Sequence, residues 1–258
     1  MITLARHTVY ITRRCVRNMI RQPAYVGIML VQPLIWLAFF GGVFRAVAEI
    51  RNFPAHSYID FLTPGVVVMS ALFSGGINGT AMIRDINNGV IDRLLTLPAR
   101  RAALILGRLG QQVVVTLVQT TVILIMAWSL GASFQNGIEG VVLLYIFAIL
   151  LGGTFAIMSN AAALLLRKEE ALSAVINFIL FPAVFLSTAF MPGSSLAGWI
   201  ATVARYNPVN WTAIAGRAVT SAHTDWSSVA QHSSYLLIFI VVCAAASVRA
   251  FHSYQRSI

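Results

Sequence analysis

The sequence predicts an all-α integral membrane protein with six membrane-spanning helices, and three observations predict it. Of the 258 residues, 58% are hydrophobic and only 10% are charged, whereas soluble domains carry about 25% charged residues. The apolar residues gather into six stretches, each long enough to cross a hydrocarbon core of roughly 30 Å as a helix. No charged residue lies near the middle of any stretch. The composition therefore excludes a disordered chain and argues against a soluble enzyme.

The first expected element is an amphipathic helix over residues 4–22, which lies in the membrane interface. At 100° per residue its five arginines fall within an arc of about 100°, and apolar residues fill the remaining face. In such a helix the arginines lie among lipid headgroups. A plain positively charged anchor for the first span is the alternative. The arginines are Arg6, Arg13, Arg14, Arg17 and Arg21.

Six spans follow within a single transmembrane domain, residues 1–258. The few charged residues inside them lie within a turn or two of an end. In the second span Gly75 and Gly79 have the spacing that favours close helix packing, although they can also simply add flexibility. The expected spans cover about 24–44, 58–83, 104–130, 138–166, 171–191 and 235–251.

The connection over residues 84–101, RDINNGVIDRLLTLPARR, predicts a short amphipathic helix. Asp85 near its start suits a helix N-terminus, and Gly89 permits a sharp turn. Ile91, Leu94 and Leu95 have helical spacing, and Pro98 ends the helix. We interpret this segment as a docking surface for a partner, with an ordinary charged connection as the alternative.

The last long connection, residues 192–234, is too long for a simple turn between two spans. Its apolar and aromatic residues are interrupted by Gly193, Gly198 and Pro208, and aromatic residues of this kind favour the membrane interface. A surface-lying amphipathic segment is one interpretation, with Arg217 as an interfacial anchor or a contact for substrate headgroups.

The distribution of Lys and Arg predicts the orientation. One side of the membrane receives 14 of the 18 cations and the other side receives Arg45, Arg51, Arg205 and Arg217. Both termini are therefore expected in the cytoplasm. The net charge of +10 is explained by topology and anionic lipid, so we expect membrane lipids and no nucleic acid as partners.

Motifs of catalysis and cofactor binding are absent from the sequence. It has no GxxxxGK(S/T) phosphate loop, HExxH, CxxC or GxSxG, so we expect no catalytic, cofactor or metal site and no enzyme activity in this chain. Cys15 lies on the apolar face and is expected to act as a small hydrophobic residue. Ion-coupled transporters usually keep charged residues near the midplane. Energy for uphill transport is therefore expected to come from outside the membrane.

Several short motifs, in this order, resemble the type-2 ABC exporter permeases (ABC-2 type), particularly their daunorubicin-resistance-like branch. The resemblance covers nearly the whole chain, and the shared order is more specific than any single motif. Many members of the family have Glu and Gly-Thr where this chain has Asp85 and Gly89-Val90. The motifs are Gln32-Pro33-Leu34-Ile35-Trp36, Tyr58-Ile59-Asp60-Phe61-Leu62-Thr63-Pro64-Gly65, Arg84-Asp85, Asp92-Arg93-Leu94, Leu97-Pro98, Gly107-Arg108, Met191-Pro192 and Tyr206-Asn207-Pro208-Val209.

The resemblance implies a permease subunit in a complex of two permeases, identical or homologous, and two separate ATP-binding subunits that hold ATP and Mg. It also implies short re-entrant outer helices between the last two spans and a cytoplasmic coupling helix. The residues implied in docking the ATPase are Asp85, Gly89, Ile91, Asp92, Arg93, Leu94, Leu95 and Pro98. A substrate route or outer gate would involve Asn160, Asn177, Trp199, Tyr206, Asn207, Pro208, Trp211 and Arg217, although Asn160 and Asn177 can instead bond neighbouring helices.

The expected function is export of a hydrophobic or amphipathic substrate, such as a drug, a lipid or a lipid-linked product. The expected location is a bacterial cytoplasmic membrane. Three alternatives remain at this point. The chain can be a permease for a polysaccharide or lipid-linked glycan, an ion-coupled secondary transporter, or a membrane scaffold that recruits a cytoplasmic partner.

Overall fold

The computed structural model describes residues 2–45, 55, 57–89, 101–221 and 224–255, which form helices and turns and contain no β-strand. The predicted all-helical class is confirmed. The helices are α1 (Ile2–Ile20), α2 (Pro23–Val43), α3 (Tyr58–Asn87), α5 (Arg101–Ser129), α6 (Gly137–Leu166), α7 (Glu169–Phe185), α8 (Gly198–Ala204), α9 (Pro208–Thr220) and α10 (Trp226–Gln255), with a 3₁₀ turn η2 (Gly193–Ser195).

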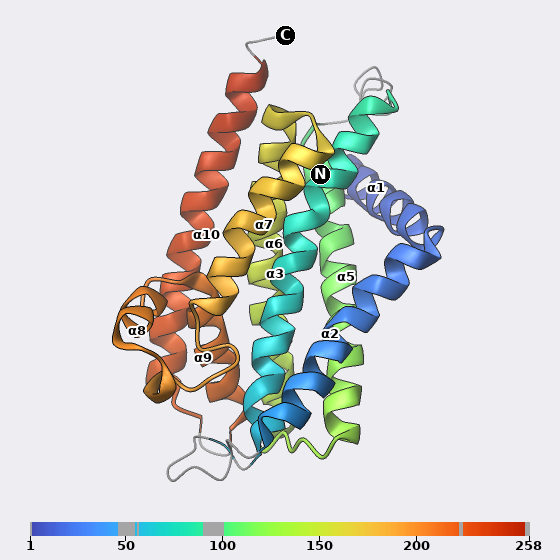
Figure 1. Ribbon diagram of the computed structural model, residues 1–258. Coiled ribbons are helices and arrows are strands. Elements are labelled where there is room, and N and C mark those ends of the chain that lie inside the picture. The colour runs from blue at the N-terminus through green and yellow to red at the C-terminus, as the bar shows by residue number, and fades with distance from the viewer. Residues whose placement is uncertain (1, 46–54, 56, 90–100, 222–223, 256–258) are drawn as a thin grey trace.

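The central element of the bundle is α3, around which α2, α5, α6, α7 and α9 pack (Figure 1). Leu62, Val66 and Leu72 on this helix have no exposed surface. Lipid is as apolar as these side chains, so burial alone cannot hold membrane helices together, and close packing has to contribute. The small residues of α3 allow that packing.

Gly75 and Gly79 lie where α3 crosses α6. A Cβ atom at Gly75 would collide with the carbonyl oxygen of Gly152, and one at Gly79 would collide with the carbonyl oxygen of Ser159. The Ser159 hydroxyl also donates to the carbonyl of Gly76 and accepts from the backbone N–H of Gly79, the latter at 3.0 Å. The predicted close packing at this pair is confirmed.

Gly75→Val is expected to lower stability by about 1–3 kcal/mol, because the added methyl groups would force α3 and α6 apart. Thermal unfolding in a neutral detergent measures this loss. Gly153→Val is the matched control, since a Cβ at Gly153 meets no atom within 4 Å. If both variants unfold at the same temperature, the contact between α3 and α6 is not close enough to exclude a side chain.

Five of the described helices are long and apolar enough to cross a membrane. They are α2, α3, α6, residues Ile105–Ser129 of α5 and residues Trp226–Ser247 of α10. These helices correspond to five of the six predicted spans. Residues 171–191 differ from the prediction, because α7 ends at Phe185. Beyond Phe185 the chain follows a non-helical path, and most of the side chains that bond its backbone come from α9 and the residue before it.

The last helix begins at Trp226, ahead of the expected start of the sixth span at about 235. The cause is a cap that the apolar pattern does not show. The Asp225 carboxylate accepts from the backbone N–H groups of Ser227 and Ser228 at 3.1 and 3.2 Å. Such bonds satisfy N–H groups that have no partner within the first turn of a helix. The polar first turns of α10 are thereby helical, and the connection that begins at residue 192 is shorter than expected.

The two ends of the bundle differ in what they contain. Figure 1 shows α1 and the last turns of α10 at one end, while α8 and α9 lie beside the opposite half. Consecutive long helices alternate in direction from α2 to α6, and α10 runs in the same direction as α6. The chain must therefore cross back between α6 and α10, and α7 runs in the returning direction.

Candidate functional site

An ion pair lies where α1, α3 and α5 meet. Asp85, in the last turn of α3, accepts from Arg108 of α5 at 2.5 Å, and Arg14 of α1 lies 3.6 Å from its other oxygen. Arg108 also donates to the carbonyl of Ala81 at 3.2 Å. The Arg108 side chain is only 5% exposed. A buried guanidinium needs such a partner because desolvation of an unpaired charge is costly.

The pair has a particular place in the chain. Asp85 lies in the last turn of α3, before the connection to α5, and Arg108 lies about two turns into α5. The two side chains therefore join the two helices that flank the segment predicted to dock a partner. Asp85 does not begin a helix, so that expectation is wrong: it lies near the C-terminus of α3, where the helix dipole disfavours a carboxylate. Arg14 and Arg108 supply the compensating charge.

A second ion pair links α3 to α7 at the same end. Arg84 donates to Glu169 at 2.9 Å, and the two side chains are 50% and 32% exposed. Exposed pairs of this kind contribute about 0–1 kcal/mol. The Arg84–Glu169 pair therefore adds little stability, but it links the last turn of α3 to the first turn of α7.

Helix α1 packs directly against α5. Ile11 and Cys15 lie on Ala103, and the Thr12 hydroxyl donates to the carbonyl of Gly107 at 3.1 Å. A side chain at Gly107 would collide with Ile11. Burial raises the pKa of the Cys15 thiol, which disfavours the reactive thiolate. One part of the apolar face of α1 thus contacts protein, while Val9 and Ile20 remain exposed.

At the opposite end, side chains of α9 and of the residue before it bond the backbone beyond α7. Asn207 donates to the carbonyls of Ala183 and Leu186 at 2.6 and 3.0 Å. The Asn210 side-chain oxygen accepts from the backbone N–H of Thr188 at 3.0 Å and from its hydroxyl at 2.6 Å. Non-helical backbone at membrane depth is tolerated only where protein supplies such partners.

Arg217 completes the same arrangement. Its guanidinium donates to the carbonyl of Thr188, to the carbonyl of Ala189 at 3.1 Å and to the carbonyl of Phe61 at 3.1 Å. It also lies 3.8 Å from the centre of the Phe61 ring, in the geometry of a cation–π contact. The residue therefore joins α3, α9 and the segment after α7.

The sequence pattern of the ABC-2 type transporter family matches residues 6–220. This chain belongs to the ABC-2 type transporter family. It is 30% identical over 210 residues to the transport permease ycf38 of Porphyra purpurea, a match that covers 80% of this chain and 71% of the relative. It is 28% identical over 193 residues to the daunorubicin resistance ABC transporter permease protein DrrB1 of Streptomyces coeruleorubidus, covering 73% and 66%. The resemblance to the daunorubicin-resistance branch is confirmed, and the ABC-2 chain is a multi-pass membrane protein.

Two of the predicted docking residues of this ABC-2 chain fall within the described structure. Asp85 forms the ion pair above, and Gly89 has a φ of +64°, a conformation that glycine adopts without strain, directly after α3. The remaining docking residues, and with them the coupling helix, lie outside the described residues: Ile91, Asp92, Arg93, Leu94, Leu95 and Pro98. Their role stays a prediction.

The residues predicted for a substrate route are not brought together. Asn160 donates to Asn78 at 3.0 Å, inside the contact between α3 and α6. Asn177 is exposed on α7. Trp199 and Tyr206 are 64% and 79% exposed. Asn207 and Arg217 bond the backbone after α7, Pro208 is the first residue of α9, and Trp211 donates to the carbonyl of Arg205 at 2.6 Å.

Arg84, Arg108 and Glu169 were not predicted as site residues. A cation near the start of an apolar helix was the available signal for Arg108, because a charge there needs a partner. The five arginines of the N-terminal segment differ in their surroundings. Arg14 contacts Asp85, whereas the other four are exposed: Arg6, Arg13, Arg17 and Arg21. Among the described residues, no group of three or more His, Cys, Asp or Glu side chains is placed to hold a metal ion.

Proposed function

We propose that this chain is the membrane-spanning permease subunit of an ATP-driven exporter for a hydrophobic or amphipathic substrate. Membership of the ABC-2 family supports the proposal, and the ion pair between Asp85 and Arg108 is the structural observation that carries it. The pair holds the two ends of the 84–101 connection together, with α1 attached through Arg14 and α7 through Arg84. A force applied to that connection would therefore reach four helices.

The proposed topology has six spans with both termini in the cytoplasm. Helix α7 has 17 residues and is about 26 Å long at 1.5 Å per residue, so the bonded segment after Phe185 would complete the crossing. The end that carries α1 is the more basic one, which favours a cytoplasmic position. The short helices α8 and α9 would then enter the outer leaflet. A bacterial cytoplasmic membrane is the proposed location.

A separate subunit would bind ATP and Mg and would dock on the 84–101 connection. The chain itself would hold no cofactor and catalyse no reaction. In this arrangement ATP-driven closure of the partner moves the connection, and α3 transmits the movement because it contacts most of the bundle.

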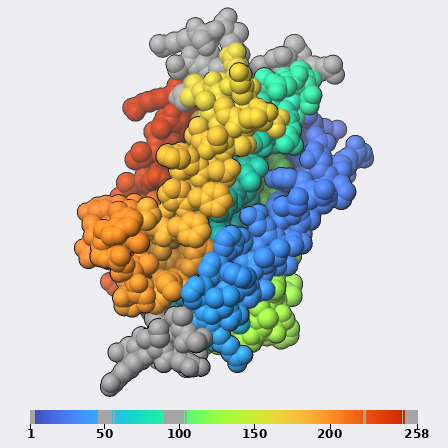
Figure 2. Space-filling view, in the orientation of Figure 1, coloured from blue at the N-terminus to red at the C-terminus, as the bar shows by residue number. Residues whose placement is uncertain are grey.

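A second permease copy is part of the proposed complex. Figure 2 shows α2 and α7 at the surface of one face. Phe178 of α7 is 82% exposed and Ile35 of α2 is 60% exposed, and Asn177 is an exposed amide within this apolar surface. A polar side chain facing lipid is unfavourable, and such residues usually bond another helix. We place the second copy on this face.

Leu94→Asp is expected to abolish co-purification of the ATPase, because a charge would replace an apolar contact of the docking surface. The permease and the ATPase that is encoded beside it would be co-expressed and purified through a tag on the permease. The mass of the wild-type complex reports whether two permeases are present. Ile138→Asp, at an exposed position in the first turn of α6 at the opposite end, is the matched control.

ATP-driven efflux from vesicles tests the function itself. Transport that follows a proton gradient without ATP would overturn the exporter assignment in favour of a secondary transporter. If Leu94→Asp leaves co-purification unchanged, the docking role of the connection is wrong.

A further inference from the structure

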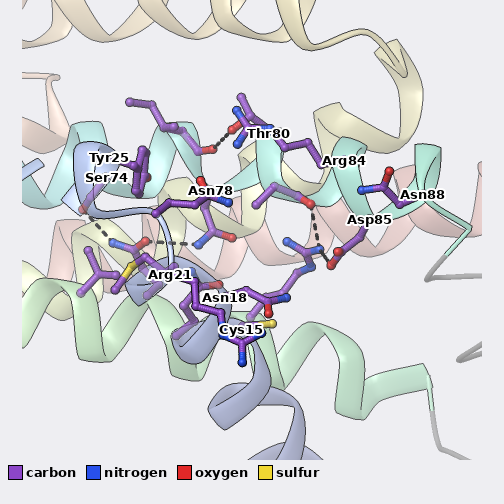
Figure 3. A pocket seen from close by; sticks show the side chains of 18 residues that line it. Cys15, Asn18, Arg21, Tyr25, Ser74, Asn78, Thr80, Arg84, Asp85 and Asn88 are labelled. Carbon is purple, nitrogen blue, oxygen red and sulfur yellow. Dashed lines mark hydrogen bonds and ion pairs between the residues drawn. The ribbon is translucent and has the colours of Figure 1, made fainter. Parts of the chain in front are cut away.

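A polar cavity of about 350 Å³ lies at the basic end of the bundle, between α1, the start of α2, α3 and α5. Figure 3 shows Cys15 and Asn18 from α1, with Arg21 from the turn after it, on one side of the cavity and Asn78, Arg84 and Asp85 from α3 on the other. A second cavity of about 110 Å³ adjoins it between α2, α3 and α5. Tyr25, Ser74 and Ile77 line both. We call the two together the α2–α3 recess.

The two parts of the recess differ in polarity. Three guanidinium groups line the larger part, from Arg21, Arg84 and Arg108, against the single carboxylate of Asp85. Arg108 and Asp85 neutralise each other. Arg84 forms an ion pair with Glu169, a residue that does not line the recess. Arg21 forms no ion pair among the described residues. The charge of the larger part is therefore positive and favours an anion.

The smaller part is lined mainly by apolar groups and ends at a buried amide. Its lining includes Ile28, Met29, Pro33 and Phe73. Gln119 is 4% exposed and donates through its side-chain nitrogen to the carbonyl of Met29 at 3.1 Å. Its side-chain oxygen is buried and has no partner. A buried acceptor left unpaired costs about 1–3 kcal/mol, so this oxygen indicates an occupant that donates a hydrogen bond.

We propose that the α2–α3 recess binds one drug-sized anionic amphiphile from the cytoplasmic leaflet, with its phosphate or carboxylate among Arg21, Arg84 and Arg108. The apolar body lies between α2 and α3 and carries an O–H or N–H group toward Gln119. The volume suits one small molecule. This inference rests on the proposed function in one respect, because the proposed topology is what places the recess at the cytoplasmic leaflet. The binding itself requires neither ATP nor a partner.

Dodecyl phosphate is the probe, with dodecyltrimethylammonium as the cation of equal chain length. The full-length permease in a neutral maltoside detergent is titrated with each. Dodecyl phosphate is expected to bind one per chain and at least tenfold more tightly than the cation. Arg21→Gln is expected to weaken phosphate binding about tenfold, and Ile77→Trp is expected to abolish it by filling the space that both cavities share.

Arg13→Gln is the matched control, because Arg13 is exposed on α1, the helix that ends just before Arg21, and does not line the recess. It is expected to leave binding within twofold of wild type. Equal weakening by Arg13→Gln and Arg21→Gln would overturn the proposal, since it would show a general attraction to a basic surface. Equal affinity for the phosphate and the ammonium amphiphile would overturn it as well.

A vesicle experiment with the ATPase present distinguishes a transported amphiphile from a resident lipid. ATP-dependent loss of a labelled phosphate amphiphile from the ATP-exposed leaflet identifies a substrate, and ATP-independent retention identifies a resident lipid. Both results support an anionic site. Specific binding without ATP-driven transport of this probe would leave the recess in place with a resident lipid as its occupant, whereas transport with binding unaffected by Arg21→Gln would overturn the recess and leave the exporter function in place.

Discussion

Arg108→Leu is expected to lower the stability of the permease by about 3 kcal/mol and to abolish ATP-driven transport while the ATPase still co-purifies. The substitution removes the closest partner of Asp85 and leaves this partly buried carboxylate with only Arg14, 3.6 Å away. The ends of α3 and α5 would then lose the contact that brackets the 84–101 connection. Thermal unfolding in detergent and efflux from vesicles measure the two effects.

A reversed pair tests whether the effect belongs to the interaction. Asp85→Arg combined with Arg108→Asp is expected to recover part of the stability that either single change removes, because opposite charges again face each other. Glu169→Gln is the stability control. It breaks the exposed pair with Arg84 and is expected to cost less than about 1 kcal/mol. An Arg108→Leu protein with wild-type stability and full transport would contradict the bracketing role.

Arg217→Met is expected to destabilise the half of the molecule that contains α8 and α9 by several kcal/mol. The change leaves the carbonyls of Thr188, Ala189 and Phe61 without the guanidinium that bonds them, and backbone acceptors at membrane depth have no water to replace it. Limited proteolysis after α7 and thermal unfolding report the loss. Arg217→Lys is expected to rescue only part of it, because an ammonium lacks the planar fork of five donors.

Arg205→Met provides the comparison for this change. Arg205 lies exposed in the same outer segment, so the loss of its charge is expected to leave stability within about 0.5 kcal/mol. If the two variants unfold alike, then Arg217 is an interfacial anchor of the kind considered from sequence, and its contacts to the backbone contribute nothing measurable.

The length and polarity of the apolar runs were sufficient to predict most of the fold. Apolar runs of about 20 residues can be identified as membrane helices without any tertiary information. The spacing of Gly75 and Gly79 favoured a close helix contact. The end of α7 was not predictable in this way, because residues 186–191 carry no charge and include only two hydroxyl side chains, which an apolar span tolerates. Their departure from the helix depends on Asn207, Asn210 and Arg217, which arrive from a later segment.

For the site as well, the sequence pattern predicted single residues but not the contacts between segments. Asp85 was predicted from its position in the docking connection, but its place in the last turn of α3 was not. Its pairing with Arg108 depends on the return of the chain after the connection, and its contact with Arg14 depends on the docking of α1 against α5. The sequence pattern of a single segment contains no information on these two contacts. The cap by Asp225 is a local signal, because an Asp ahead of two serines is a common start of a helix.

The Asp85–Arg108 pair also makes the connection between α3 and α5 a self-contained cassette. Because the pair joins α3 and α5 on its own, the residues between the two helices are expected to be exchangeable as a block while the helices keep their contact. Transplanting residues 88–100 from a relative, with Asp85 and Arg108 retained, is then expected to redirect the permease to that relative's ATPase. Partner choice would then be determined by a short exchangeable segment, independently of the helices that form the rest of the bundle.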